Sequence, residues 1–198
     1  MRIPDRIVDG YREMKRSLAC RRAKKIVIGS GGGTFPGWFS TCKETLDVCD
    51  RGSFVRYWRP NSRSMFLSEH VWEHLSREEG ARACVNCFEF LKPGGRLGFA
   101  VPDGLHPDPD YVERVRPGGT GEGAADHKVL YTFKTLGELL EEAGFEVELL
   151  EYWDENRTFH FREWSSEDGH IRRSMRFDPR NRGGSLSYTS LITDARKP

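Results

Sequence analysis

The sequence lacks long apolar runs and any strong excess of charge. Hydrophobic residues make up 37% of its 198 residues, and no apolar run approaches the roughly 18 residues that a membrane-spanning helix needs. Its 31 basic residues are balanced by 30 acidic ones, so the net charge of +1 gives no general attraction to nucleic acid or to an anionic membrane. The first residues also lack the apolar core of a signal peptide. These absences predict a soluble cytoplasmic protein, with neither membrane nor nucleic acid as its partner.

Cysteines are few, and the sequence has no internal repeat or low-complexity tract. The five cysteines are an odd number spread over core-like segments, which predicts reduced thiols rather than a disulfide framework. Since a domain typically has about 150 residues, this length predicts that residues 1–198 form a single domain.

What the sequence does contain is a glycine-rich loop directly after an apolar run. Lys25–Ile28 is typical of a buried parallel strand, and four of the next five residues are glycine. Glycines here allow a sharp turn and the close approach of a ligand, and in open α/β sheets ligands bind outside the carboxyl ends of the strands. We therefore expect a nucleotide-like cofactor.

The loop does not fit a dinucleotide or a P-loop. A dinucleotide fingerprint needs glycine at the sixth position, where this chain has Thr34, and Phe35-Pro36-Gly37 breaks the helix that would anchor a pyrophosphate. No Gly-Lys-Ser/Thr follows, which excludes a P-loop. A sulfonium nucleoside, which carries no phosphate, fits better.

The rest of the chain alternates strands with helices. A basic surface helix is expected over residues 1–24, covering one edge of the sheet. Helices are expected after Ser76, with Glu79 completing a capping box, and after Thr135, with Glu138. Further strands are expected at 38–42, 64–68, 96–101, 145–153 and 185–195.

Two long segments interrupt this alternation. Residues 105–130 form a loop with a short helical piece near 111–115, and residues 154–184 form an insertion before the last strand. Together the elements predict an α/β fold: a doubly wound, mostly parallel Rossmann-like sheet with an antiparallel edge strand.

Six short segments follow one another in a recognisable order. They are Ile28-Gly29-Ser30-Gly31-Gly32, Pro36-Gly37-Trp38, Leu46-Asp47, His70-Val71-Trp72-Glu73-His74-Leu75, Leu91-Lys92-Pro93-Gly94-Gly95 and Ala100-Val101-Pro102-Asp103. In this order the chain, from about Lys25 to Ala195, resembles class I S-adenosylmethionine (SAM)-dependent methyltransferases. More closely, it resembles the small predicted members of this family in which the motif after the family's fourth strand is His-x-x-Glu-His, here His70 to His74.

The resemblance implies SAM as the cofactor and a role for each matching segment. The first loop would hold the methionine part of SAM through Gly29, Ser30 and Gly31. The adenine would face Asp47, with Val48 beside it, and the sulfonium would be closed in by Glu69 and His70.

One acid that the resemblance leads us to expect is missing. The turn after the second strand normally offers an acid to the ribose hydroxyls, and by spacing from Gly37-Trp38 this position is Cys42. A thiol is a weak donor and acceptor, so the change would cost roughly 1.5–3 kcal/mol, or one to two decades of affinity. Thr41 or Glu44 could compensate. Otherwise the cofactor binds weakly, or the chain is a non-catalytic binding or scaffold protein.

The segment from His70 to His74 also matches the inverted zinc-protease motif. Zinc proteases place such a motif on a long helix, whereas here it follows an apolar strand, and Ser76 begins the next helix. Cys84 and Cys87 lie on the core stripe of that helix, where cysteines behave as small hydrophobes. No metal site is therefore expected.

In the methyltransferase interpretation the same segment offers catalytic candidates. His70 or His74, paired with Glu73, could take a proton from a hydroxyl acceptor, or Glu73 and His74 could only brace the turn. His127 is a second candidate base. Trp72 is interpreted chiefly as a packing residue and is kept as a candidate for contact with the acceptor.

The acceptor is expected beside the loop at 105–130. Candidate contacts are Asp103, His106, Tyr131, and Arg172 and Arg173, which could clamp a carboxylate or phosphate. The expected function is SAM-dependent methyl transfer to a hydroxyl or amine of a small molecule or saccharide. An RNA methyltransferase stays open as an alternative, and it would need a continuous basic face from the N-terminal helix to the arginine-rich insertion.

Overall fold

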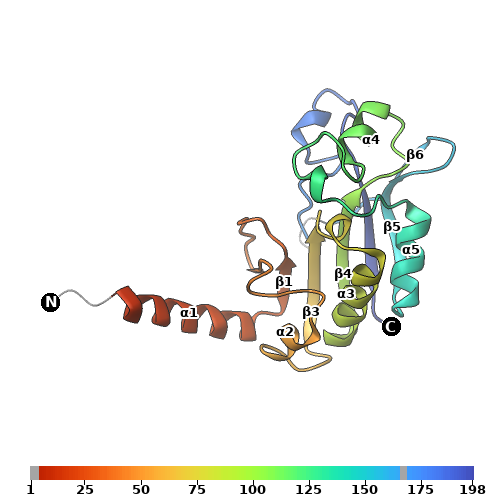
Figure 1. Ribbon diagram of the computed structural model, residues 1–198. Coiled ribbons are helices and arrows are strands. Elements are labelled where there is room, and N and C mark those ends of the chain that lie inside the picture. The colour runs from red at the N-terminus through yellow and green to blue at the C-terminus, as the bar shows by residue number, and fades with distance from the viewer. Residues whose placement is uncertain (1–4, 166–168) are drawn as a thin grey trace.

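A computed structural model describes residues 5–165 and 169–198 and contains one seven-stranded mixed sheet (Figure 1). The strand order is β2-β1-β3-β4-β7-β5-β6. The strands are β1 (Lys25–Ile28), β2 (Phe39–Ser40), β3 (Arg63–Glu69), β4 (Leu91–Pro102), β5 (Glu146–Trp153), β6 (Phe159–Phe161) and β7 (Ser190–Arg196). The α-helices are α1 (Asp5–Arg22), α2 (Arg51–Val55), α3 (Arg77–Phe90), α4 (Pro109–Val115) and α5 (Phe133–Glu142), and short 3₁₀ turns are η1 (Trp72–His74), η2 (Ala124–Asp126) and η4 (Pro179–Asn181). No helix in these ranges is long and apolar enough to cross a bilayer.

The sheet confirms the expected fold class. Strands β2, β1, β3 and β4 are parallel, so their carboxyl ends meet at one edge, with Ile28 paired to Ser68 and Ser68 to Phe99. The last strand, β7, is antiparallel to both neighbours and lies between β4 and β5 rather than at the edge. The antiparallel edge strand is the short β6, which lies in the 154–184 insertion and pairs with β5 just before it.

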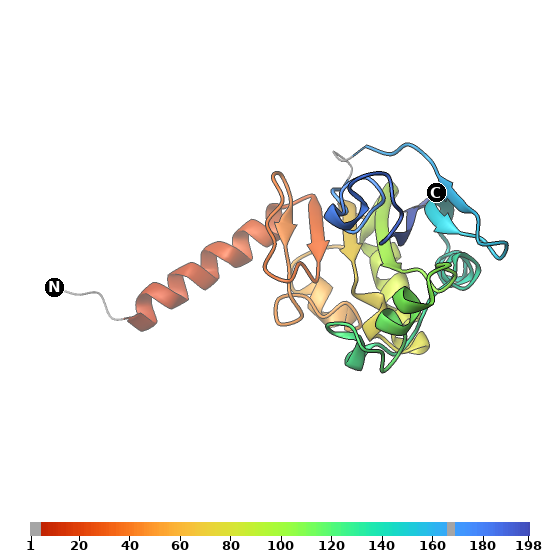
Figure 2. The same cartoon turned by 90° about the horizontal axis from the view of Figure 1, so that it is seen from above.

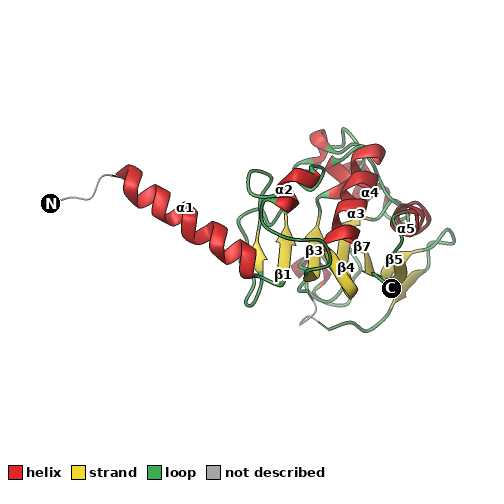
Figure 3. Cartoon of the chain, turned by 90° about the horizontal axis from the view of Figure 1, so that it is seen from below, coloured by secondary structure: helices red, strands yellow, loops and turns green. Residues whose placement is uncertain are grey.

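Helices cover one face of this sheet (Figure 3). Strand residues that alternate toward this face, such as Ile26, Phe66 and Phe99, are buried against α3 and α5. Helix α3 begins at the capping box of Ser76 and Glu79, as predicted. The predicted start of α5 is wrong: Thr132 is its N-cap and Thr135 the third helical residue, because the Thr132 hydroxyl reaches the Thr135 amide.

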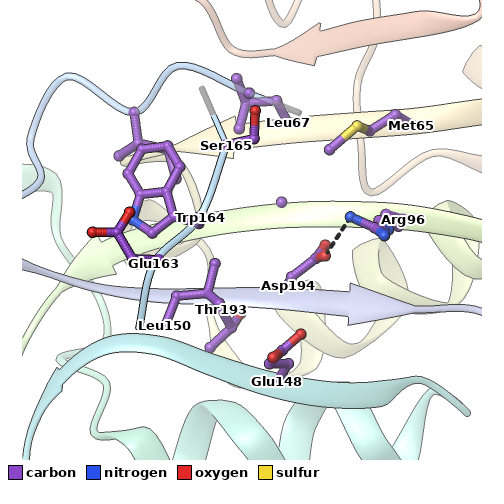
Figure 4. A pocket seen from close by; sticks show the side chains of 13 residues that line it. Met65, Leu67, Arg96, Glu148, Leu150, Glu163, Trp164, Ser165, Thr193 and Asp194 are labelled. Carbon is purple, nitrogen blue, oxygen red and sulfur yellow. Dashed lines mark ion pairs between the residues drawn. The ribbon is translucent and has the colours of Figure 1, made fainter. Parts of the chain in front are cut away.

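The opposite face is covered by irregular chain instead of helices. Its smaller apolar layer contains Val27, Leu67, Ala100 and Ile192, and Ile171 of the insertion packs on it. Figure 2 shows this late segment of the chain lying across the sheet. A cavity of about 230 Å³ remains between the sheet and the segment around Trp164, beside the ion pair of Arg96 and Asp194 at 3.2 Å (Figure 4).

Helix α1 projects away from the sheet (Figures 1 and 2), so the expectation that it covers a sheet edge is wrong. Its end is fastened at Cys20, which is buried and whose carbonyl accepts a hydrogen bond from Trp58 Nε1 at 2.9 Å. Met14 and Leu18 are exposed. Its apolar positions are too sparse to cover a sheet edge along the whole helix.

Candidate functional site

The glycine loop after β1 lies against the turn after β3. Gly29 and Gly31 have φ values of +63° and +56°, a backbone conformation that favours glycine. A Cβ added at Gly29 would lie 2.6 Å from Cγ2 of Val71, so only glycine allows the two turns to approach this closely. The loop itself is closed by a hydrogen bond from the Gly33 amide to the Ser30 carbonyl at 2.9 Å.

Two cavities open at this edge of the sheet, and the first has a volume of about 290 Å³. It is lined by Val27, Ile28, Gly29, Ser30, Gly31, Phe35, Leu67, Glu69, His70, Arg172 and Arg173. The two arginines come from the insertion, and Glu69 Oε1 accepts the Arg173 backbone N–H at 2.9 Å. The Arg172 guanidinium lies over the Phe35 ring, 5.3 Å from its centre.

The residues that were predicted to contact the ribose and the adenine are not among the described residues that line this cavity. Thr41 is buried, and its hydroxyl donates to the Val27 carbonyl at 2.8 Å. The Cys42 thiol lies 3.3 Å from the Thr45 hydroxyl, and Asp47 Oδ1 accepts the Cys49 amide at 3.0 Å. Val48 belongs to the core on the helix-covered side. Because the Thr41 side chain is buried, its hydroxyl is not exposed to replace the missing ribose acid.

His70 stands at the end of β3 with both ring nitrogens engaged. Its φ of +55° is uncommon for a residue other than glycine. Nδ1 lies 3.0 Å from Glu73 Oε1, and Nε2 lies 2.9 Å from the Ser190 hydroxyl. With Nδ1 facing a carboxylate, the neutral ring carries its proton there and accepts from Ser190 at Nε2. These two contacts leave His70 no free nitrogen for a substrate proton.

Glu73 is the most deeply buried acid of this turn, with 1% of its surface exposed. Burial alone would raise its pKa, but the hydrogen bond from His70 holds the pKa below its ordinary value. Its Oε2 has no hydrogen-bond partner within the described ranges. The Glu73 backbone carbonyl accepts the amide of Lys128 at 2.6 Å, which brings the end of the long loop onto η1.

His74 and His127 therefore meet beside Glu73, although they are 53 positions apart in the chain. Their ring centres lie 4.7 Å apart, edge to face. His127 Nδ1 donates to the Val115 carbonyl at 2.7 Å, which leaves Nε2 as the basic nitrogen. One potential ligand atom from each of Glu73, His74 and His127 lies within 4.8 Å of the other two.

A second cavity, of about 540 Å³, opens over this cluster. It is lined by His70, Glu73, His74, Arg114, Val115, Gly121, Glu122, Gly123, His127, Arg173, Arg180 and Tyr188. His70 and Arg173 line both cavities, so the two are adjacent. The structure thus gathers all four predicted catalytic residues at one cavity.

Sequence reasoning missed seven of the residues that line the second cavity, among them Arg114, Arg180 and Tyr188. Arg180 carried a weak local signal, since Asp178 two residues earlier caps η4 and holds the guanidinium through two bonds of 2.8 and 2.7 Å. Arg114 on α4 and Tyr188 before β7 gave no signal, because only the folded loops bring them together.

Four predicted acceptor contacts lie in the interior and line neither cavity, so this placement does not support contact with an acceptor. Trp72 is fully buried and donates to the Gly80 carbonyl at 3.2 Å. Tyr131 is buried against the same core, and burial raises its pKa. His106 stacks on Tyr111 with ring centres 3.9 Å apart, and burial lowers its pKa.

Asp103 is the fourth of these residues and acts as a buried anchor. Its carboxylate accepts the backbone amides of Leu105 at 2.9 Å and Trp153 at 2.8 Å. Burial raises its pKa from 3.8 to about 6, although both amide bonds favour the ionised form. Asp103 thus ties the end of β4 to β5.

Comparison with known proteins identifies the fold but not a close relative. No protein-family model and no curated protein matches the chain. A SAM-dependent methyltransferase from Archaeoglobus fulgidus is 15% identical with a TM-score of 0.51, and the match covers 97% of this chain and 94% of that one. An S-adenosylmethionine dependent methyltransferase from Mesorhizobium loti is 14% identical with a TM-score of 0.50, with coverages of 96% and 99%.

A third solved structure, a SAM-dependent methyltransferase from Thermotoga maritima described as a possible histamine N-methyltransferase, is 14% identical with a TM-score of 0.50. It covers 98% of this chain and 97% of its own. These three matches extend over almost the whole length of the chain. The chain has the Rossmann-like fold of the class I SAM-dependent methyltransferases.

Proposed function

We propose that the protein binds SAM in the first cavity and transfers its methyl group to a hydroxyl or amine of a small anionic molecule or saccharide in the second. The observation that carries this proposal is the adjacency of the two cavities, which share His70 and Arg173. Methyl transfer needs the acceptor aligned with the methyl group, which two adjoining cavities can provide.

The residues of the first cavity fit the methionine end of the cofactor. Gly29 and Gly31 keep the backbone open to a close ligand, and the Arg172 guanidinium can pair with a carboxylate. When bound, SAM supplies an electrophilic methyl group on a sulfonium. His70 and Glu69, at the end of β3, would then form the wall toward the acceptor.

The second cavity favours an anionic acceptor. Three arginines, Arg114, Arg173 and Arg180, are among the residues that line it. Arg180 is already paired with Asp178, so Arg114 and Arg173 would supply most of the attraction. His74 and the Nε2 of His127 are the basic groups available for an acceptor proton, while His70 holds Glu73 in place.

Calorimetric titration with S-adenosylhomocysteine (SAH) tests the cofactor half of the proposal. We expect saturable binding that Arg172→Ala weakens by about tenfold or more, because a charged hydrogen bond is lost. Arg182→Ala removes an exposed arginine that lines neither cavity and serves as the control. Absence of heat at high micromolar SAH would contradict the proposal.

The acceptor half is tested by transfer of labelled methyl groups from SAM to a panel of hydroxylated and aminated carboxylates, phosphates and acidic sugars. Labelling that Arg114→Ala reduces supports an anionic small acceptor. Labelling of RNA instead, with steep salt dependence, would favour the RNA methyltransferase alternative. SAH binding without transfer to any of these classes would favour a binding or scaffold role.

A further inference from the structure

We propose that Glu73, His74 and His127 form a binding site for a divalent transition metal, with Zn²⁺ as the expected occupant. Two imidazoles and one carboxylate are a ligand set typical of zinc sites that keep a position open for another ligand. The sequence motif alone gave no reason to expect a metal, because His70 and His74 do not share a helix. The third ligand comes instead from the long loop, and His70 is not part of the set.

The geometry lies close to what zinc needs. Ligand atoms about 2.0–2.2 Å from zinc at tetrahedral angles are separated by roughly 3.3–3.6 Å. The three atoms here lie within 4.8 Å of one another, so side-chain rotations that shift these atoms by about one ångström would bring them to a common ion. The His74 ring is half-buried and makes no hydrogen bond within the described ranges, which leaves it free to make that adjustment.

The hydrogen bond that His127 makes suits its neutral ring to coordination. Metal-binding histidines commonly donate their second ring nitrogen to a carbonyl or carboxylate, which fixes the ring and its tautomer. His127 Nδ1 donates to the Val115 backbone carbonyl at 2.7 Å, so Nε2 carries the lone pair on the side of the cluster.

Glu73 supplies the charge that such a site requires. Burying an ionised carboxylate is costly unless its oxygens are paired. Oε1 contacts His70, but Oε2 is buried and has no hydrogen-bond partner among the described residues, although Glu73 lines the second cavity. A cation held between Oε2 and the two imidazoles would satisfy this atom.

The proposal goes beyond methyl transfer and does not depend on it, and an ion bound here would occupy the two histidine nitrogens that are otherwise available for an acceptor proton. A bound metal would have its open position on the cavity that Arg114 and Arg173 also line. An anionic ligand could therefore reach the ion and the guanidinium groups together. If SAM did not bind at all, the three-residue site would still be expected to hold zinc.

The test is titration of the metal-stripped chain with Zn²⁺, monitored by calorimetry, with Co²⁺ as a spectroscopic probe and Mg²⁺ for comparison. We expect one equivalent of Zn²⁺, weak or no binding of Mg²⁺, and Co²⁺ bands without a thiolate charge-transfer component. His74→Ala and His127→Ala should each weaken Zn²⁺ binding by roughly 100-fold or more, since second-shell changes alone cost 10–100-fold. His160→Ala, which removes a histidine paired with Asp154 elsewhere, should leave the affinity unchanged.

Because His127 anchors a loop, circular dichroism and SAH titration accompany each variant. His74→Ala should fold normally and keep its SAH affinity while it loses Zn²⁺, which separates this proposal from the cofactor proposal. Three results would overturn it: no stoichiometric Zn²⁺ binding, Zn²⁺ affinity unchanged in both variants, or a Co²⁺ thiolate band that disappears in Cys42→Ser or Cys49→Ser.

Discussion

The two sides of the sheet's carboxyl edge are built differently. On the β1 side the shape of the loop depends on its backbone. Gly29 and Gly31 have left-handed conformations, and the Thr41 hydroxyl donates a hydrogen bond to the Val27 carbonyl. On the β3 side the turn is shaped by buried side chains, with Glu73 between His70 and the long loop. The first side can surround a ligand closely, whereas the second can carry charge into a low-dielectric region.

The β1 side of this edge therefore determines how closely a ligand can approach, and the β3 side carries the ionisable groups. We expect changes on the β3 side to act mainly through packing and ionisation, and changes on the β1 side to act mainly through backbone strain and ligand affinity. The following variants test that division.

The largest effect is expected for Trp72→Ala, beneath the charged turn. Trp72 is fully buried against Phe99, with ring centres 4.7 Å apart, so its loss should reduce the free energy of unfolding by about 3–5 kcal/mol. Denaturant unfolding monitored by circular dichroism measures this. Trp38→Ala, at a half-buried position beside the glycine loop, should cost clearly less. Equal losses would show that the two sides do not differ in their dependence on packing.

A pH-dependent effect of about 3 kcal/mol is expected from Asp103, at the end of β4. Its folded-state pKa of about 6 lies above the ordinary value of 3.8, so the folded state keeps a proton that the unfolded state has lost between these values. Asp103 therefore makes the free energy of unfolding fall as pH rises from about 4 to 6, by up to roughly 3 kcal/mol.

Unfolding curves at several pH values, compared with those of Asp103→Asn, isolate this contribution. The variant should lack that part of the decline, whereas Glu141→Gln, an exposed acid on α5, should retain it. A wild-type slope that Asp103→Asn leaves unaltered would assign the decline to other groups.

The sequence predicted the parts of this edge that depend on local patterns. The apolar run before Gly29 and the capping box of Ser76 and Glu79 are local signals, and both elements formed as predicted. The start of α5 was misplaced because Thr132 and Thr135 both look like caps, and only the folded chain shows which hydroxyl meets a free amide.

The meeting of Glu73 with His127 could not be predicted from the sequence. It depends on backbone hydrogen bonds from Lys128 and Val129 to the Glu73 carbonyl, which carry no side-chain signature. Asp103 and His106 were expected to face the acceptor because they flank the long loop, which is the usual acceptor side in the fold class that the chain resembles. Their burial reflects tertiary packing against Tyr111 and Trp153, which the sequence pattern does not show.

On the β1 side, Cys42→Asp is expected to tighten SAH binding by about one to two decades. A carboxylate at this turn could accept hydrogen bonds from a ribose diol, worth roughly 1.5–3 kcal/mol. Calorimetry with SAH measures the change, and Cys42→Ser, which adds no charge, should leave the affinity near that of the wild type. If Cys42→Asp does not bind more tightly, the ribose lies elsewhere than the resemblance implies.

The smallest effect on stability is expected for Gly31→Ala, which separates backbone strain from crowding. An added Cβ meets no atom within 4 Å, so the cost comes from the φ of +56° and should be about 1–2 kcal/mol. Gly137→Ala in α5 also adds its Cβ in open space, but in a helix, where alanine should stabilise by up to about 1 kcal/mol. Opposite signs in denaturant unfolding would confirm that the loop conformation itself requires glycine. SAH affinity should fall only in Gly31→Ala, because the new methyl group would stand in the first cavity, and an unchanged affinity there would remove the glycine loop from the proposed cofactor site.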